Sequence, residues 1–122
     1  MANHVLLVED NELARDAMML LLQHTGHQVS VAGSVAEALM VARRERPDLL
    51  LLDLTLPDGD GLEIVRELLL LDNPPTFVAL TGHDVSEVAD RCLAAGCISV
   101  MMKPVTSKDL LATVDPLLAR RG

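Results

Sequence analysis

Short apolar segments alternate with longer segments of mixed polarity along this chain. The apolar segments are His4–Val8, Gln28–Ala32, Asp48–Leu52, Thr76–Leu80 and Ile98–Met102. Runs of this length are typical of strands that are buried on both faces of a sheet. The alternation therefore predicts five β-strands, each followed by a helix.

The segments between these strands carry signals for helix starts. Ser34 and Asp84 are each followed three residues later by a glutamate, a spacing in which both side chains can bond free N–H groups of the first turn. The last helix is predicted to begin at Thr106 or Ser107. Because proline lacks an N–H and crowds the preceding turn, Pro116 predicts that this helix kinks or ends early.

The first helical segment has apolar residues at helical intervals, and this spacing predicts the face that packs on the sheet. These residues are Leu13, Ala17, Leu20 and Leu21, and the same stripe continues to His24.

Strands that are separated by helices run parallel and are joined by right-handed crossovers. We therefore expect an α/β fold, a doubly wound five-stranded parallel sheet covered by helices on both sides. In the flavodoxin-like strand order 2-1-3-4-5, the first and third strands are neighbours.

Length and composition limit what the chain can do. Its 122 residues are half hydrophobic, which suits a single domain spanning residues 1–122 with Cys92 and Cys97 in its core. A net charge of −8 and one aromatic residue, Phe77, argue against direct binding of nucleic acid. No apolar run is long enough to cross a membrane, and the N-terminus lacks the pattern of a signal peptide. We expect a cytoplasmic protein that does not act at a membrane.

Polar residues follow the predicted strands at their carboxyl ends, where such sheets bind ligands. Glu9 and Asp10 follow the first strand, Asp53 the third, Thr81 the fourth and Lys103 the fifth. Three carboxylates close together repel one another unless a cation neutralises them. Their oxygens favour a hard cation, Mg2+ or Ca2+, over zinc. Mg2+ commonly bridges to a phosphate that a lysine and a hydroxyl can also contact. Since an aspartate can itself accept a phosphoryl group, the strand ends predict phosphoryl transfer.

Five motifs occur in order along the chain. They are Val5–Asn11, Leu52–Gly61, Leu80–Gly82, Gly96 and Met102–Pro104. Together they resemble the receiver domain of bacterial two-component response regulators, and the resemblance covers essentially the whole chain.

The resemblance implies a role for each acidic residue. Asp53 matches the phosphoacceptor, which takes a phosphoryl group from the phosphohistidine of a histidine kinase or a histidine phosphotransfer domain. Glu9 and Asp10 match the pair that holds Mg2+, with Asp10 the more direct ligand, and Thr55 would supply a backbone carbonyl. The expected protein is a signalling switch whose only chemistry is self-phosphorylation and slow autodephosphorylation, and not a metabolic enzyme.

The resemblance also implies which residues respond when Asp53 is phosphorylated. Thr81 matches the switch hydroxyl, and Lys103 the phosphate-binding lysine, which in the family is usually followed by a cis bond to proline, here Pro104. The family often has Tyr or Phe where this chain has Val100, a residue too short and stiff to make the same swing. We therefore hypothesise that activation shifts the loop after Thr81 together with the face formed by the fourth helix, the fifth strand and the fifth helix. His83, in this loop, is a candidate for tuning phosphate lifetime.

Partner or effector binding is expected on the face formed by the helix after Asp84, the strand Ile98–Met102 and the helix after Thr106. The chain fits either a single-domain regulator or part of a longer regulator or hybrid kinase.

Three alternative functions fit the residues less well. An aspartyl-phosphate phosphatase needs a second acid two residues after the nucleophile, where this chain has Thr55. A flavin-binding electron carrier would need aromatic residues to stack on the ring, and Phe77 is the only one. A receiver that serves as a non-phosphorylated scaffold would not need all five polar residues at the strand ends.

Overall fold

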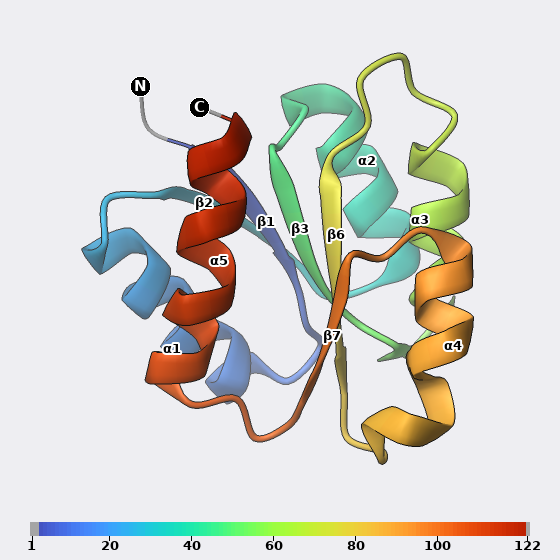
Figure 1. The fold of residues 1–122 in the computed structure, drawn as a ribbon. Coiled ribbons are helices and arrows are strands. Elements are labelled where there is room, and N and C mark those ends of the chain that lie inside the picture. Colours follow the sequence, from blue (N-terminus) through green and yellow to red (C-terminus); the bar gives the residue numbers. More distant parts are fainter. Residues whose placement is uncertain (1–2, 122) are drawn as a thin grey trace.

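All five predicted sheet strands form, and they pair in parallel in one sheet (Figure 1). The computed structural model describes residues 3–121. The strands are β1 (His4–Val8), β2 (Gln28–Ala32), β3 (Leu49–Asp53), β6 (Thr76–Thr81) and β7 (Ser99–Met102). Their order within the described residues is β2-β1-β3-β6-β7, which confirms the predicted order 2-1-3-4-5.

The helices between the strands cover both faces of the sheet. They are α1 (Glu12–His24), α2 (Val35–Glu45), α3 (Leu62–Leu68), α4 (Val85–Ala95) and α5 (Ser107–Arg121). Figure 1 shows α1 and α5 on one side of the sheet and α2, α3 and α4 on the other. The fold is therefore doubly wound, as the alternation of strands and helices requires.

The central strand β3 supplies side chains to both core layers. Leu50 and Leu52 pack with residues of α2, α3 and α4, whereas Leu49 and Leu51 pack with residues of α1 and α5. All four leucines are fully buried, and each contributes roughly 1.5–3 kcal/mol through burial. This buried strand carries Asp53 at its carboxyl end.

The buried face of α1 differs from the predicted one. Leu13 is 84% exposed and Leu20 is 62% exposed, while Leu22 is fully buried and Met18 and Met19 pack partly against the core. The prediction was confirmed for Leu21, which packs partly against the core, and was wrong for Leu13 and Leu20. Helix α1 carries apolar residues around most of its surface, so more than one stripe has helical spacing. The position of the helix after β1, not the spacing alone, decides which stripe faces the sheet.

Helix α5 continues through Pro116 to Arg121, so of the two predicted outcomes the early end was wrong, and the kink stays a prediction. Its core contacts explain why the helix persists. Leu110, Val114 and Leu118 recur every four residues on one face and are buried against the sheet. Pro116 itself lies on the exposed side.

A short antiparallel hairpin, which the sequence analysis did not predict, separates β3 from α3. Its strands are β4 (Thr55–Leu56) and β5 (Gly59–Asp60), and Thr55 pairs with Asp60 across it. Two-residue strands are too short to show an alternating pattern. The hairpin leads to Gly61, which lies against the backbone of Asp53.

Within the described residues, no helix combines the length and the apolar character needed to cross a membrane.

Candidate functional site

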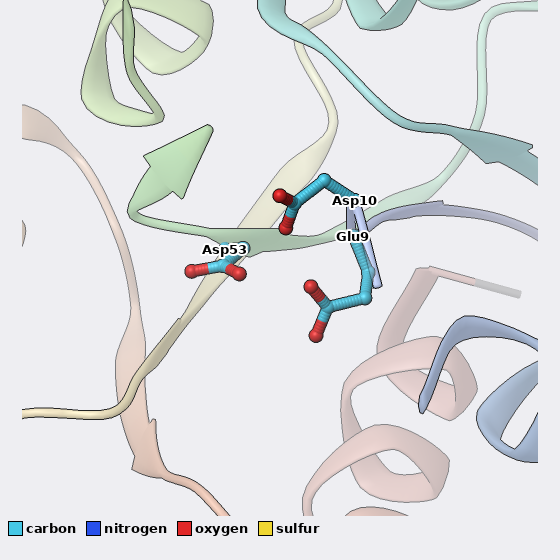
Figure 2. Close-up of side chains that lie close together, drawn as sticks. All are labelled: Glu9, Asp10 and Asp53. Carbon is cyan, nitrogen blue, oxygen red and sulfur yellow. The ribbon is translucent and has the colours of Figure 1, made fainter. Parts of the chain in front are cut away.

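Three carboxylates meet at the carboxyl ends of β1 and β3. Val8 pairs with Leu52 in the sheet, so that Glu9 and Asp53 follow at the same level. One oxygen from each of Glu9, Asp10 and Asp53 lies within 4.8 Å of the others (Figure 2). Glu9 is 1% exposed and Asp53 is 7% exposed, whereas Asp10 is open to solvent. The structure therefore brings together the acidic residues that the sequence singled out.

Lys103 supplies the positive charge of this cluster. Its Nζ donates to Asp53 Oδ2 at 2.7 Å and also to Glu9 Oε1. The lysine reaches the site from the end of β7, where its backbone N–H donates to the Thr81 carbonyl at 2.7 Å. The bond from Lys103 to Pro104 is cis, as the resemblance implies.

Burial and the neighbouring charges shift the pKa values of Glu9 and Lys103. Burial raises the pKa of Glu9, although the hydrogen bond from Lys103 opposes that shift. Burial would lower the pKa of Lys103, but its bonds to Asp53 and Glu9 outweigh this effect and raise the pKa. The site thus contains crowded acids with one ammonium ion, an arrangement that a further cation would stabilise.

The oxygen atoms of the cluster suit a hard divalent ion. Glu9, Asp10 and Asp53 offer only carboxylate oxygens, which are the ligands that Mg2+ prefers in proteins. Asp10 is the most accessible of the three, and it is therefore the best placed to meet an incoming ion.

Thr55 and Thr81 flank Asp53. The backbone N–H of Thr55 donates to Asp53 Oδ1 at 3.1 Å, and the Thr55 side chain is exposed. Thr81 is buried at the end of β6, one residue past Leu80, which pairs with Asp53 across the sheet. The hydroxyl oxygen of Thr81 accepts a hydrogen bond from His83 N at 3.0 Å.

His83 itself lies on an exposed loop at this edge, two residues past Thr81. The two cysteines lie away from this site. They are buried in the core layer between the sheet and helices α2, α3 and α4. Burial raises the pKa of Cys97 to about 12, so this residue stays a neutral thiol and serves packing.

Two groups that hold Glu9 were not among the predicted site residues. The Asn11 N–H donates to Glu9 Oε2 at 3.3 Å, and Arg15 Nη1 donates to the Glu9 carbonyl at 3.5 Å. The signal for Arg15 is its place one turn after Asn11, which directs the side chain back over the start of α1.

The family model and the curated relatives that match this sequence point to the same family. The family model described as "Response regulator receiver domain" matches residues 5–115. The transcriptional regulatory protein AfsQ1 of Streptomyces coelicolor is 36% identical over 118 residues, which are 97% of this chain and 52% of that protein. The response regulator MprA of Mycobacterium leprae is 34% identical over 116 residues, which are 95% of this chain and 51% of that protein. The chain thus spans about half the length of these relatives.

Solved structures of response regulators share the fold of this chain. A CheY-like response regulator receiver domain protein from Methanospirillum hungatei has a TM-score of 0.92 and 28% identity, covering 99% of this chain and 97% of that one. The chemotaxis response regulator CheY4 of Vibrio cholerae has a TM-score of 0.90 and 27% identity, covering 97% of this chain and all of that one.

Proposed function

This chain belongs to the response regulator receiver domain family, and from that premise we propose that it is a phosphorylation-controlled signalling switch with Asp53 as its phosphoacceptor. The observation that carries the proposal is the placement of Asp53. Its carboxylate ends the most buried strand, beside two further carboxylates and the Lys103 ammonium. Burying a carboxylate is costly, and clusters of buried acids with a charged partner are typical of functional sites.

The phosphoryl donor is the phosphohistidine of a histidine kinase or a histidine phosphotransfer domain. A carboxylate oxygen of Asp53 attacks the phosphorus, the phosphorus–nitrogen bond breaks, and the ring nitrogen keeps the bonding electrons. Hydrolysis later reverses the state, because water attacks the same phosphorus and releases inorganic phosphate and the Asp53 carboxylate.

Mg2+ is the cofactor that fits this site. Glu9, Asp10, Asp53 and the backbone carbonyl of Thr55 would hold it, and once bound it neutralises charge on the transferring phosphoryl group. Lys103 exchanges its contact with the Asp53 carboxylate for one with a phosphoryl oxygen. Thr81 donates its hydroxyl hydrogen to a second oxygen, because the bond from the His83 N–H uses only a lone pair of the hydroxyl oxygen and leaves this hydrogen free to donate.

A groove beside the site gives the donor protein a place to dock. It has a volume of about 450 Å3, and Glu9 and Lys103 form its polar end, while Ala14, Ala17 and Met18 are part of its α1 wall. The exposed Leu13 and Leu20 of α1, which are not needed in the core, add apolar surface on this helix. An apolar partner surface that presents a phosphohistidine would fit here.

Output is proposed on the face formed by α4, β7 and α5. A second groove, of about 440 Å3, follows β7 and α5 and is lined by Val100, Met102 and Ala112, among others. Met102 is exposed there. An effector or partner protein bound on this face would sense the position of β7 and of the loop after Thr81.

Intact-mass measurement after incubation with acetyl phosphate tests the proposal. We expect one phosphoryl adduct that requires Mg2+ and is lost in Asp53→Asn. Asp72→Asn, a change of the same kind at an exposed position, should keep the adduct. An adduct that persists in Asp53→Asn, or that forms equally with excess chelator, would refute the assignment. If acetyl phosphate gives no adduct, a phosphorylated histidine kinase serves as the donor, and failure with both donors contradicts the proposal.

A further inference from the structure

Asp58 lies in the turn of the β4–β5 hairpin, yet its carboxylate bonds to a helix that precedes it in the chain. Oδ1 accepts a hydrogen bond from Val35 N at 2.7 Å, and Oδ2 accepts one from Ala36 N at 3.0 Å. Val35 and Ala36 are the first two residues of α2. One side chain thus joins the loop after the phosphoacceptor to the start of a helix.

Helix α2 leaves these two N–H groups open because its own capping residues serve other groups. Ser34 Oγ accepts from Glu37 N at 3.2 Å, and Glu37 Oε1 accepts from Gly33 N at 2.8 Å. The first N–H groups of a helix have no partner inside the helix. The hairpin therefore supplies the acceptors that the N-terminus of α2 lacks.

The same hairpin carries a group of the proposed site. Thr55 N donates to Asp53 Oδ1 at 3.1 Å, and Thr55 pairs with Asp60 across the hairpin. Leu56, the next residue, is buried in the same core layer as Val35 of α2. The position of the Thr55 backbone thus depends on how the hairpin is held against α2.

We infer that Asp58 is a positioning residue, which bonds the start of α2 and thereby holds the Thr55 backbone against Asp53. The inference rests on the proposed function, in which the Thr55 carbonyl is a ligand of Mg2+. Asp58 is exposed and bonds α2, not the carboxylate cluster. The N–H groups of Val35 and Ala36 hold the pKa of Asp58 below its usual range, so the carboxylate is ionised at neutral pH.

The test compares Asp58→Ala with Ser34→Ala. Both changes remove an acceptor from the N-terminus of α2, but only Asp58 links this helix to the hairpin. We expect Asp58→Ala to speed hydrogen exchange of the Thr55 amide about three- to ten-fold, the range that corresponds to losing a helix cap. The Mg2+ concentration at half-saturation, followed by NMR, should rise by a similar factor. Ser34→Ala should leave both quantities near wild type.

Asp58→Asn keeps one carbonyl oxygen in place and should restore part of the effect, and it also serves if Asp58→Ala does not fold. Unchanged exchange of the Thr55 amide in the Asp58 variants would overturn the inference. Equal changes in Ser34→Ala would overturn it too, since stability of α2 would then be the whole cause. A wild-type chain without an Mg2+-dependent adduct would contradict the proposed function, while the exchange comparison would still decide the role of Asp58.

Discussion

Gly61 shows how closely single residues are fitted around the site. A Cβ at this position would lie 2.2 Å from the backbone carbonyl oxygen of Asp53, which cannot move without disturbing β3. We expect Gly61→Ala to lower the free energy of unfolding by at least about 2 kcal/mol, as for strong overpacking. Urea denaturation measures the change. The same variant should also bind Mg2+ more weakly, because the clash displaces Asp53.

Gly82 is the matched control for this prediction. It also follows a site residue, Thr81, but a Cβ there would meet no atom within 4 Å. Gly82→Ala should change the free energy of unfolding by no more than about 0.5 kcal/mol. Similar losses in both variants would contradict the explanation by contact with Asp53.

At the residue scale, the sequence predicted where the site residues lie better than what they touch. Glu9, Asp10 and Asp53 meet because parallel strands end at one edge of the sheet, which topology alone predicts. Neither the bond from Lys103 to Glu9 nor the capping of α2 by Asp58 could be predicted. Both depend on side-chain rotamers and loop geometry that no spacing along the chain encodes. The catalytic and metal-binding roles of these residues stay predictions.

At the scale of the elements, Pro116 is an unfavourable residue in the interior of α5. Pro116 cannot donate a backbone hydrogen bond within this helix, yet the helix extends beyond it. Since Pro116 is exposed and its neighbours Val114 and Leu118 hold the packing, Pro116→Ala should raise the free energy of unfolding by about 1–3 kcal/mol. Thermal and urea unfolding would measure it. An unchanged or lower stability would mean that the path of α5 requires the proline.

A second prediction concerns the contacts among β1, β2 and α2 at the far end of the sheet. Ser30 Oγ donates to Glu45 Oε1 at 2.6 Å and therefore accepts from His4 Nε2 at 2.8 Å. The bonds from Ser30 and then Arg44 lower the pKa of Glu45 from its ordinary value of 4.5. A depressed pKa in the folded state stabilises the fold above the unfolded value, and this contribution is lost as the pH falls through the folded value.

The destabilisation caused by Ser30→Ala should therefore be largest near neutral pH and should shrink below about pH 4. Urea unfolding of the wild type and the variant at several pH values tests this. In a Glu45→Gln background the pH dependence of the Ser30 effect should disappear. A Ser30 effect that is the same at pH 3 and pH 7 would show that the charge of Glu45 does not contribute to it.

Elements could be predicted where the pattern was long and unambiguous. The run Leu49–Leu52 has no polar interruption and forms a strand buried on both faces. The face of α1 was predicted wrongly, because Leu13 and Leu20 have the same helical spacing as residues that do pack. The end of α5 was predicted wrongly because packing of Leu110, Val114 and Leu118 outweighs a local preference.

For the molecule as a whole, the proposed switch would have to work without the aromatic residue that the family often has where this chain has Val100. Val100 lies partly buried on β7, where a short branched side chain cannot swing between two positions. We expect beryllofluoride with Mg2+ to shift backbone NMR resonances from Thr81 through the α4–β7–α5 face, across residues 85–105. Asp53→Asn should show no such response. Unchanged resonances across 85–105 in the wild type would contradict activation through this face.

The strand order places the proposed phosphoacceptor, Asp53, and the proposed output face in different parts of one sheet. Among the described residues, β3 has hydrogen-bonded neighbours on both sides, whereas β7 has one. Under the proposed function, phosphorylation would therefore take place on a strand that is paired on both sides, and its readout would include an edge strand that is paired on one side only. A displacement too small to deform the centre can then be expressed as movement of an edge strand, at little cost to the stability of the whole domain.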